Sequence, residues 1–559
     1  MQMNGAQLTI RLLERRGVRI VAGIPGGAIL PIYDALAQAP AIRHVLARHE
    51  QGAGFIAQGM ARVTGLPAVC MASSGPGVTN LLTAIADAKL DSTPIIAITG
   101  QVPRRMIGTD AFQEVDAYGL SVSVTKHNFL VSSARELLDV IPRAFAIATE
   151  GRPGPVWIDI PKDIQTETID VDELPTASGE TRTPTPTIDQ RAVEEAAALI
   201  NAAERPVLYL GGGVIHSPGG ATWAMALAEK ATLPTTMTLM ALGALPADHA
   251  LSLGMLGMHG ARYTNLAMEE CDLLIAVGAR FDDRATGDAK RFCPAARIVH
   301  IDIDPAELGK IKTADVSIAG DVATTLAALL RRIEPRKRDT WRARIAALKQ
   351  AYPLVMPGAD DPLAHYGLIR AVADGVDDSA IITTDVGQHQ MWVAQAYPLR
   401  QPRRWITSGG LGTMGFGVPA AIGAALAAPD RTVVCFTGDG SLLMNIQELA
   451  TAADEGVNIK IVLMNNNSLG LVHQQQELFY DKRIYASLYR TQTDFLAVAR
   501  GFGVSAVDLD VVAEPRTALR AALRTPGPCL IHASIDTHAK VFPMVPPGAA
   551  NREMIGGLL

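Results

Sequence analysis

Asp439 and Asn466 are residue types that hold a divalent cation, and each follows a strand-like run: Val-Val-Cys-Phe before the first, Ile-Lys-Ile-Val-Leu-Met before the second. A helix-like segment, 445–455, lies between them. A right-handed strand–helix–strand unit brings both loops to the carboxyl edge of neighbouring parallel strands, where open α/β sheets bind ligands. A carboxylate and an amide oxygen suit a hard cation, and Gly438 and Gly440 allow backbone N–H groups to approach an anion. The alternative is an ordinary βαβ turn, in which Gly-Asp-Gly is also common.

Glu50 lies among small residues, in Arg-His-Glu-Gln-Gly-Ala-Gly, near the start of an expected helix. Gly52 and Gly54 allow that helix to pack closely, so the carboxylate could be buried against a ligand and exchange protons with it. The alternative is an exposed glutamate that the helix dipole favours at the amino end.

Two glycine-rich loops have both a binding and a structural interpretation. Residues 73–77, Ser-Ser-Gly-Pro-Gly, follow a strand-like run and precede a helix expected to begin near Thr79, so they either bind an anion or simply turn the chain. Residues 410–415 match Gly-x-Gly-x-x-Gly, but no clean strand precedes them and no well-placed acid follows, so we do not expect a nicotinamide site. Met414 in this loop is either an apolar wedge under a bound ring or a core methionine.

The middle of the chain carries the signs of a dinucleotide site. Residues 278–284, Gly-Ala-Arg-Phe-Asp-Asp-Arg, follow one strand-like run, and Asp302 and Asp304 end the next. An acid at a strand end is well placed for ribose hydroxyls, and Arg280 for a pyrophosphate. A network of surface ion pairs is the alternative.

These motifs alternate with helix-like segments in three successive units, which predicts an α/β protein with three doubly wound parallel sheets. The units are 1–165, 190–335 and 362–540, joined by a polar, proline-containing linker at 166–189 and a charged segment at 331–361. Strands are expected at 18–23, 67–71, 95–99, 156–160, 207–210, 273–277, 298–303, 433–436 and 459–464.

Composition excludes several classes of protein. At 48% apolar and 19% charged residues, the 559-residue chain can bury large cores and is not disordered. The net charge of −6 provides no basic surface for nucleic acid. Five scattered cysteines without a Cys-x-x-Cys motif indicate a reducing cytoplasm, and residues 1–9 lack the apolar core of a signal peptide. Residues 405–429 carry no charge, but their glycines and Pro419 favour a buried loop and helix over a membrane span.

The motifs together resemble those of thiamine-diphosphate enzymes. Gly-Asp-Gly-Ser, followed by asparagine 27 positions after its aspartate, is similar to the metal–diphosphate motif of that family, and Glu50 matches its cofactor-activating glutamate. Longer segments resemble the catalytic large subunits of acetolactate (acetohydroxyacid) synthases: GIPGGAILPIYDAL, SSGPGVTNL, GTDAFQEVD, TKHNFLV, RPGPVWIDIPKD, GARFDDR, TTDVGQHQMW and GLGTMGFGVPAAIGA. Within that family, LMNNNSLGLVHQQQELFY and MVPPGAAN look most like isozyme I of enteric bacteria.

The resemblance implies a pyrimidine-binding domain, a central FAD-binding domain and a diphosphate-binding domain. It also implies a homodimer, or a tetramer, in which Glu50 of one subunit meets the diphosphate-binding domain of the other. A small regulatory subunit is expected as a further partner, while nucleic acid and membranes are not.

The resemblance also implies roles for individual residues. Mg²⁺ would be bound by Asp439, Asn466 and the carbonyl of Ser468, and Met414 would hold thiamine diphosphate bent. The implied catalytic residues are Glu50, Gly27, Gln113 and Lys162, and the implied substrate contacts are Phe112, Lys162, Arg284 and Gln475. Further contacts to thiamine diphosphate are implied for Ser74, Gln113, Val386, Gly387, Gln388, His389, Gly412, Gly438, Gly440, Ser441, Asn466 and Gly470. Contacts to FAD are implied for Arg152, Gly212, His259, Gly278, Arg280, Asp282, Arg284, Asp302, Ile303 and Asp321.

The implied reaction is decarboxylation of pyruvate and transfer of its two-carbon unit to a second 2-keto acid. Pyruvate then gives 2-acetolactate and 2-oxobutyrate gives 2-aceto-2-hydroxybutyrate, the first common step of branched-chain amino acid biosynthesis; FAD is implied without a net redox role. A flavin-dependent pyruvate oxidase and a flavin-free 2-keto acid decarboxylase are alternatives on the same architecture. The GTDAFQEVD and GARFDDR segments favour the synthase.

Gln475 departs from the family pattern. Most relatives have tryptophan at this place, where it favours 2-oxobutyrate by contacting its additional methyl group. Because one methylene in an apolar pocket is worth about 1–3 kcal/mol, we expect weak selectivity between the two acceptors.

Overall fold

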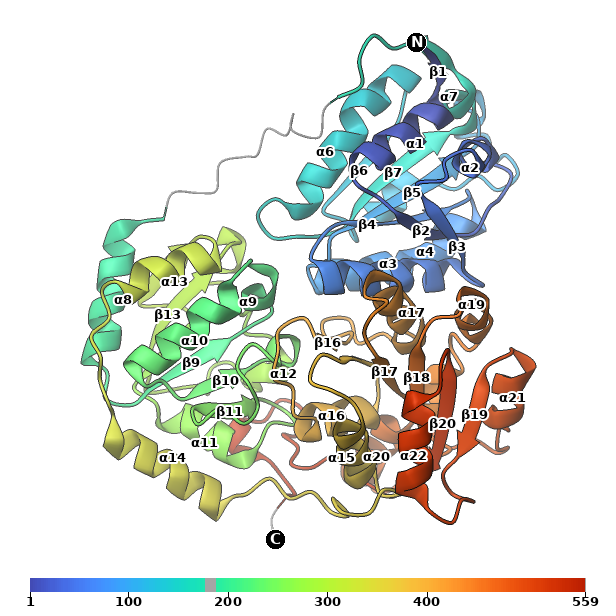
Figure 1. Cartoon of the computed structure of the whole chain (residues 1–559). Coiled ribbons are helices and arrows are strands. Elements are labelled where there is room, and N and C mark those ends of the chain that lie inside the picture. The colour runs from blue at the N-terminus through green and yellow to red at the C-terminus, as the bar shows by residue number, and fades with distance from the viewer. Residues whose placement is uncertain (176–187, 558–559) are drawn as a thin grey trace.

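The computed structural model describes residues 1–175 and 188–557 and contains three six-stranded parallel sheets, each covered by helices (Figure 1). Half of the expected linker at 166–189, residues 176–187, lies outside the described residues, and its described part contains the short strand Thr168–Asp170. The three doubly wound sheets predicted from the sequence are therefore confirmed. No helix in the described ranges is both long enough and apolar enough to cross a membrane.

The first sheet has the order β3–β2–β4–β5–β7–β6. Its strands are β2 (Ile20–Gly23), β3 (Arg43–Leu46), β4 (Ala68–Ala72), β5 (Ile95–Gln101), β6 (His127–Leu130) and β7 (Val156–Pro161). Its helices are α1 (Gly5–Arg15), α2 (Leu30–Ala37), α3 (Glu50–Thr64), α4 (Pro76–Leu90), α5 (Ala117–Ser121), α6 (Leu137–Thr149) and α7 (Lys162–Thr166). Alternate residues of β5 enter different cores: Ile96 and Ile98 pack with α1 and α6, while Ile95 and Ala97 pack with α3 and α4. Because both faces are buried, the strands are apolar throughout.

The middle sheet has the order β11–β10–β9–β12–β13–β14. Its strands are β9 (Pro206–Leu210), β10 (Thr235–Met237), β11 (Ser252–Met255), β12 (Leu273–Val277), β13 (Arg297–Asp302) and β14 (Val316–Ala319). Its helices are α8 (Gln190–Ala202), α9 (Gly213–His216), α10 (Gly220–Ala231), α11 (Arg262–Glu270), α12 (Asp283–Thr286), α13 (Val322–Leu330) and α14 (Asp339–Ala351).

The third sheet has the order β16–β15–β17–β18–β20–β19. Its strands are β15 (Ile381–Thr384), β16 (Trp405–Ile406), β17 (Val433–Gly438), β18 (Ile459–Asn465), β19 (Ser505–Asp508) and β20 (Cys529–Ser534). Its helices are α15 (His365–Gly375), α16 (Gln388–Ala396), α17 (Gly417–Ala427), α18 (Asp439–Leu442), α19 (Glu448–Glu455), α20 (Gly470–Phe479), α21 (Phe495–Gly501) and α22 (Pro515–Arg524).

Two helices begin elsewhere than the sequence pattern indicates. The helix expected near Thr79 begins at Pro76, because proline is preorganised for the first helical position. The helix expected over 445–455 begins at Glu448. Asn445 instead donates from Nδ2 to Gly415 O at 2.8 Å, which holds it in the turn between α18 and α19.

The first and third sheets are joined through α3 and α17, which cross in close contact (Figure 1). A Cβ atom on Gly59 would collide with Ala420 O, and one on Gly423 would collide with Ile56 O. Of the small residues singled out near Glu50, Gly52 meets the Glu448 side chain and Gly54 packs on Ala84 of α4.

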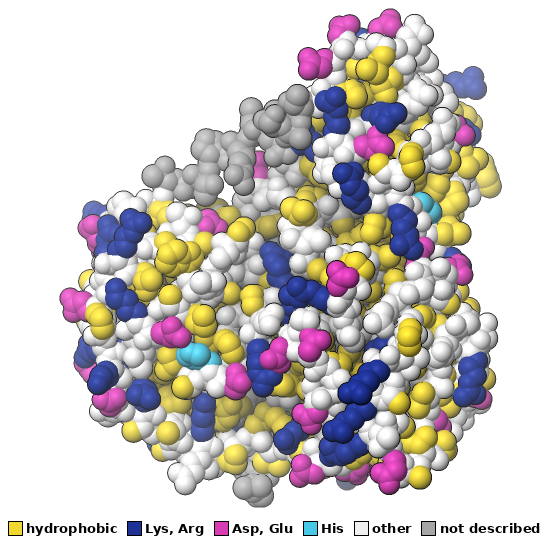
Figure 2. Space-filling model, viewed as in Figure 1, with side chains coloured by type: hydrophobic (Ala, Val, Ile, Leu, Met, Phe, Trp, Pro, Cys, Tyr) yellow, Lys and Arg dark blue, Asp and Glu magenta, His cyan; other side chains and the backbone are white. Residues whose placement is uncertain are grey.

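Segments at the two ends of the chain complete the fold. β1 (Gln2–Asn4) pairs antiparallel with β8 (Thr168–Asp170), next to the first sheet. The C-terminal segment returns to the middle sheet, where Val545 N donates to Met258 O at 2.9 Å and Asn551 Nδ2 donates to Ala285 O at 2.9 Å. On the visible face, Lys and Arg side chains are interspersed with Asp and Glu side chains (Figure 2).

Candidate active site

Each sheet reverses its strand order at a point inside the sheet, and the predicted site loops lie at these three inner points. The order reverses between β2 and β4, between β9 and β12, and between β15 and β17. At the carboxyl ends of these strand pairs lie residues 24–27 and 73–77, 211–213 and 278–284, and 385–389 and 438–441. Ligands of open α/β sheets bind at such switch points.

Asp439 follows β17 directly and is 3% exposed. Its Oδ2 atom is buried without a hydrogen-bond partner among the described residues. Burial raises the pKa of this carboxyl to about 6, against the lowering effect of nearby backbone N–H groups. A buried carboxylate oxygen with free lone pairs suits a cation.

Asn466 and Ser468 lie beside Asp439, because β17 and β18 pair with Gly438 opposite Met464. Asn467 adopts a left-handed backbone (φ +53°), which turns the chain beyond β18. Asn466 Oδ1 accepts from Ser468 N at 3.2 Å, and Asn466 Nδ2 donates to Gln388 Oε1 at 3.0 Å. Oδ1 keeps a second lone pair for a ligand.

Gln388 and His389 begin α16 and face the same loops. A Cβ atom on Gly438 would lie 2.9 Å from His389 Nδ1, and one on Gly470 would collide with Gln388 Oε1. Burial lowers the pKa of His389 to about 3, so its imidazole is neutral, and its Nε2 atom has no partner in the described part of the chain. The two glycines therefore make room for these side chains, and among the described residues His389 Nε2 is left for a ligand.

Asp385 positions the loop that carries Met414, and the sequence reasoning missed it. Its carboxylate accepts from Gly415 N at 2.8 Å and from Gly417 N at 3.2 Å, and burial raises its pKa to about 6. The Met414 Cε atom lies 3.5 Å from where a Cβ of Gly440 would stand, so Met414 reaches the Asp439 loop. An aspartate directly after β15 was the available signal.

Glu50 is half-buried at the first position of α3. Its Oε2 atom accepts from Asn80 Nδ2 at 2.9 Å, and its Oε1 atom lies 3.6 Å from where a Cβ of Gly77 would stand. Asn80 was not singled out in the sequence. Glu50 thus faces the 73–77 loop.

Glu448, also missed from the sequence, holds the start of α3 against the third sheet. Its Oε1 atom accepts from Arg48 N at 3.0 Å, and a Cβ on Gly52 would collide with its carboxylate. Burial raises the pKa of Glu448 to about 7. Its partner Arg48 is 400 positions away, so no local sequence pattern predicts this contact.

Gln113 lies against the 73–77 loop as well. Gly75 adopts φ +59°, and a Cβ there would lie 2.9 Å from Gln113 Cα, so only glycine fits. Ser74 is buried beside it with an unpartnered hydroxyl, among the residues described. Phe112, in contrast, is 87% exposed in the single chain.

Gly27 and Lys162 are connected through their neighbours. Gln165 on α7, which begins at Lys162, donates from Nε2 to Ala28 O at 2.8 Å. Gly26 packs on Ser73, since a Cβ there would lie 2.5 Å from the Ser73 side chain. The loops carrying Gly27, Lys162, Ser74, Gln113 and Glu50 therefore meet at one edge of the first sheet.

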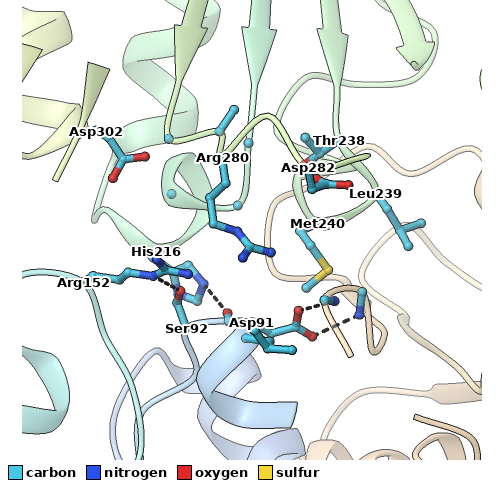
Figure 3. A pocket seen from close by; sticks show the side chains of 18 of the residues that line it. Asp91, Ser92, Arg152, His216, Thr238, Leu239, Met240, Arg280, Asp282 and Asp302 are labelled. Carbon is cyan, nitrogen blue, oxygen red and sulfur yellow. Dashed lines mark hydrogen bonds between the residues drawn. The ribbon is translucent and has the colours of Figure 1, made fainter. Parts of the chain in front are cut away.

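A cavity of about 1550 Å³ lies between all three sheets (Figure 3). It exceeds the roughly 300–1,000 Å³ of common ligand pockets and suits an extended ligand. All ten residues predicted to contact FAD line it: Arg152, Gly212, His259, Gly278, Arg280, Asp282, Arg284, Asp302, Ile303 and Asp321. Gly412 and Gln475 line it as well.

The polar lining of this cavity is assembled from distant segments. Gly213 and Gly278 cross so closely that a Cβ on Gly278 would lie 2.7 Å from Gly213 Cα. Arg152, from the first domain, donates to Ser92 Oγ at 2.9 Å (Figure 3). It also donates to Glu307 Oε1 of the middle domain at 2.8 Å. Burial raises the pKa of Asp302 to about 6.

The loop at 409–412 is fixed to the first domain by Asp91, which the sequence did not single out. Asp91 accepts from Gly410 N at 2.7 Å and Gly409 N at 3.1 Å (Figure 3). It also pairs with Arg62 at 2.8 Å. The glycines thus let this loop approach α4. Opposite it, His259 donates from Nδ1 to Pro543 O at 3.2 Å, and burial lowers its pKa to about 4.

Three family descriptions match successive parts of the chain. They are the N-terminal TPP-binding domain (residues 3–120), the central domain (193–329) and the C-terminal TPP-binding domain (385–533) of thiamine pyrophosphate enzymes. The chain is 61% identical to the acetolactate synthase isozyme 1 large subunit of Escherichia coli, over 99% of this chain and 98% of the relative. The chain belongs to the acetolactate synthase family of thiamine pyrophosphate enzymes.

More distant members of the acetolactate synthase family also match along the whole chain. The acetolactate synthase large subunit of Parasynechococcus marenigrum is 49% identical over 99% of this chain and 91% of the relative. The chloroplastic acetolactate synthase of Arabidopsis thaliana is 44% identical over 99% and 84%. The resemblance found in the sequence is confirmed, as is thiamine diphosphate as the cofactor of the family.

Proposed function

We propose that this chain is the catalytic subunit of an acetolactate synthase. It decarboxylates pyruvate and joins the two-carbon unit to a second pyruvate, giving 2-acetolactate, or to 2-oxobutyrate, giving 2-aceto-2-hydroxybutyrate. This is the first common step of branched-chain amino acid biosynthesis. The observation that carries the proposal is the end-to-end match to acetolactate synthases, together with Glu50 and Asp439 at the switch points of two sheets.

Asp439, Asn466 and the Ser468 carbonyl would hold Mg²⁺. The unpartnered Asp439 Oδ2 atom, among the described residues, supports this assignment, as does the second lone pair of Asn466 Oδ1. The diphosphate would lie along Gly438, Gly440 and Ser441, where small residues let N–H groups approach an anion.

Gly387, Gln388, His389, Gly470 and Met414 would line the thiamine rings. The bound coenzyme supplies the electron sink that takes up the charge left by the departing carbon dioxide. Glu50 would exchange a proton with the aminopyrimidine nitrogen N1′, and Asn80 fixes the direction of its carboxylate. Ser74, Gln113, Val386 and Gly412 would complete the enclosure that excludes water.

Gly27, Gln113, Lys162, Phe112 and Arg284 would surround the keto acids. Arg284 is exposed to the cavity and pairs only loosely with Asp283 at 3.8 Å, so its guanidinium is available for an acceptor carboxylate. Lys162 is half-buried at the start of α7.

The large cavity would hold FAD, with no net redox role. Its size, the glycine crossing at Gly213 and Gly278, and the ten predicted contacts support this assignment. Arg280 would face the pyrophosphate and Asp302 a ribose.

Replacing Asp302 with alanine is expected to weaken FAD retention by about 10–150-fold, the range for one hydrogen bond to a charged group. The measurement is the ratio of visible flavin absorbance to protein after dialysis. Asp339→Asn, an exposed acid on α14, is the matched control and should keep its flavin. A flavin content of Asp302→Ala equal to the control would remove Asp302 from the site.

We further propose a homodimer with the active site between chains and a small regulatory subunit as partner. Exposed apolar side chains near Gln113, namely Phe112 (87%), Val122 (56%) and Tyr118 (47%), support a partner surface there. The functional domains would be 1–165, 190–335 and 362–540, and the five buried, unpaired cysteines accord with a reducing cytoplasm.

Incubation of the pure protein with pyruvate, Mg²⁺ and thiamine diphosphate tests the function. We expect a five-carbon product and one carbon dioxide for two pyruvates. Acetaldehyde without a five-carbon product would indicate a decarboxylase, and oxygen consumption with acetate or acetyl phosphate would indicate an oxidase; both outcomes contradict the proposal.

Gln475→Trp is expected to raise the preference for 2-oxobutyrate over pyruvate as acceptor by about 5–150-fold, the equivalent of 1–3 kcal/mol. Gln475 lines the cavity, where an apolar ring would bury the additional methyl group. Competition between both keto acids, with the two products quantified, provides the ratio. Strong preference for 2-oxobutyrate in the native protein would contradict the assigned role of Gln475.

A further inference from the structure

Two histidines and a glutamate converge outside the sites described above. His473 and Glu477 stand four residues apart on α20, so they share one face of the helix. His538 follows β20 and lies opposite them. The ligand atoms of the three side chains all lie within 4.8 Å of one another.

Both imidazoles are free to bind a metal. Across residues 1–175 and 188–557, neither His473 nor His538 makes a side-chain hydrogen bond or an ion pair, and their rings lie 5.9 Å apart. His473 is buried, while His538 is exposed, so an ion can enter from solvent. Lys540 pairs with Glu477 Oε2 at 3.0 Å, which leaves Oε1 for a ligand.

We propose that His473, Glu477 and His538 bind a divalent transition-metal ion of the Zn²⁺ class. Two imidazoles and one carboxylate are a common zinc ligand set, whereas Mg²⁺ and Ca²⁺ prefer oxygen ligands to imidazole nitrogen. Bonds of about 2.0–2.2 Å in tetrahedral geometry bring ligand atoms to roughly 3.4 Å, so side-chain rotation closes the shell around an ion. A water molecule takes the fourth position.

Among the described residues, a second histidine–carboxylate group has no free ring nitrogen. It consists of Asp508, Asp510 and His532. His532 Nδ1 lies 3.0 Å from Asp508 Oδ1, and its Nε2 lies 3.0 Å from Asn465 Nδ2. Both ring nitrogens already have partners, so no lone pair is left for an ion.

The bound ion would clamp residues 538–541 onto α20 next to the cofactor loops. Gln474, beside His473, accepts from Val541 N at 2.8 Å and from Gln388 Nε2 at 3.1 Å. Gln388 also donates to Ala539 O at 2.7 Å. The ion therefore reinforces a junction that includes Gln388.

Titration of the full-length protein, free of affinity tag, chelators and thiamine diphosphate, with Co²⁺ tests the proposal. We expect one equivalent per chain with the intense visible band of four-coordinate Co²⁺, displaced by Zn²⁺, and a rise in Tm.

His538→Ala removes one of the ligands at an exposed position, so the fold stays intact. The affinity for Co²⁺ should fall by at least the roughly 10–100-fold that is lost when a residue hydrogen-bonded to a metal ligand is removed. Lys540→Met should bind more tightly, because it frees Glu477 Oε2.

Two control variants separate this site from others. His249→Ala, at a histidine paired with Glu229, and Asp439→Asn, at the predicted Mg²⁺ site, should both keep the band. No visible band in the native protein, or unchanged Co²⁺ affinity in His538→Ala, would overturn the proposal.

Discussion

Glu50→Gln is expected to lower the kcat for acetolactate formation by about 10²–10⁴-fold, the contribution of a positioned acid–base group. The amide keeps the size of the side chain and still accepts from Asn80, so α3 and its close contact with α17 remain. The substitution therefore removes only the ability of the side chain to give and take a proton. Steady-state kinetics with pyruvate at saturating Mg²⁺ and thiamine diphosphate give kcat, while circular dichroism and Tm report folding.

The matched control is Glu448→Gln, at a buried glutamate of the same interface. Its amide oxygen still accepts from Arg48 N, so we expect activity within a few-fold of the native protein. Near-normal turnover in Glu50→Gln would remove Glu50 from its role, and equal losses in both variants would indicate a packing defect.

Asp439→Asn is expected to abolish Mg²⁺-dependent binding of thiamine diphosphate and to lower activity by at least about 10²-fold. The reason is that the Mg²⁺ ion that holds the phosphates loses its anionic protein ligand. Fluorescence or calorimetric titration with the coenzyme, with and without Mg²⁺, measures the loss. Coenzyme affinity that still rises with Mg²⁺ as in the native protein would refute the assignment.

The same substitution is expected to stabilise the cofactor-free protein at neutral pH. Burial raises the pKa of Asp439 from 3.8 to about 6, so the charged form destabilises the fold. This cost is absent below about pH 4, grows between pH 4 and 6 and is complete above pH 6. Asp439→Asn removes it, which is worth about 2–3 kcal/mol at pH 7.5 and about half of that at pH 5.

Denaturant melts of both proteins at the two pH values, in chelator and without coenzyme, give the difference. The comparison cancels the other buried acids, such as Asp385 and Glu448, which are the same in both proteins. If the free energy of unfolding of Asp439→Asn at pH 7.5 were lower than that of the native protein, the carboxylate would have a stabilising partner.

The motifs were predictable because their signals are local. Asp439, Asn466 and Asp302 each stand at the end of a short β-branched run, and the chain order of strands and helices already implies right-handed crossovers. Glycine positions were informative for the same reason: Gly52, within the α3 helix, marks a close approach that its lack of a side chain permits.

The acids that position the site loops could not be predicted in this way. Glu448 binds the Arg48 backbone, 400 positions away, and Asp91 binds the 409–410 backbone, 318 positions away or more. Asp385 binds the Gly415 backbone, 30 positions away. Each is an ordinary acid in its own segment. Only its burial and its distant N–H partners show that it positions a loop.

Residue types and their local order therefore specified the strands, the loops that follow them and the chemistry those loops can perform. Tertiary packing alone decided that Arg152, Asp302 and Gln475 line one cavity, that α3 crosses α17, and that Glu448 of the third domain holds Arg48 and Gly52 at the start of α3. The reason is that hydrogen-bonded strands and turns depend on neighbouring residues, whereas a cavity between domains depends on which distant surfaces are buried together.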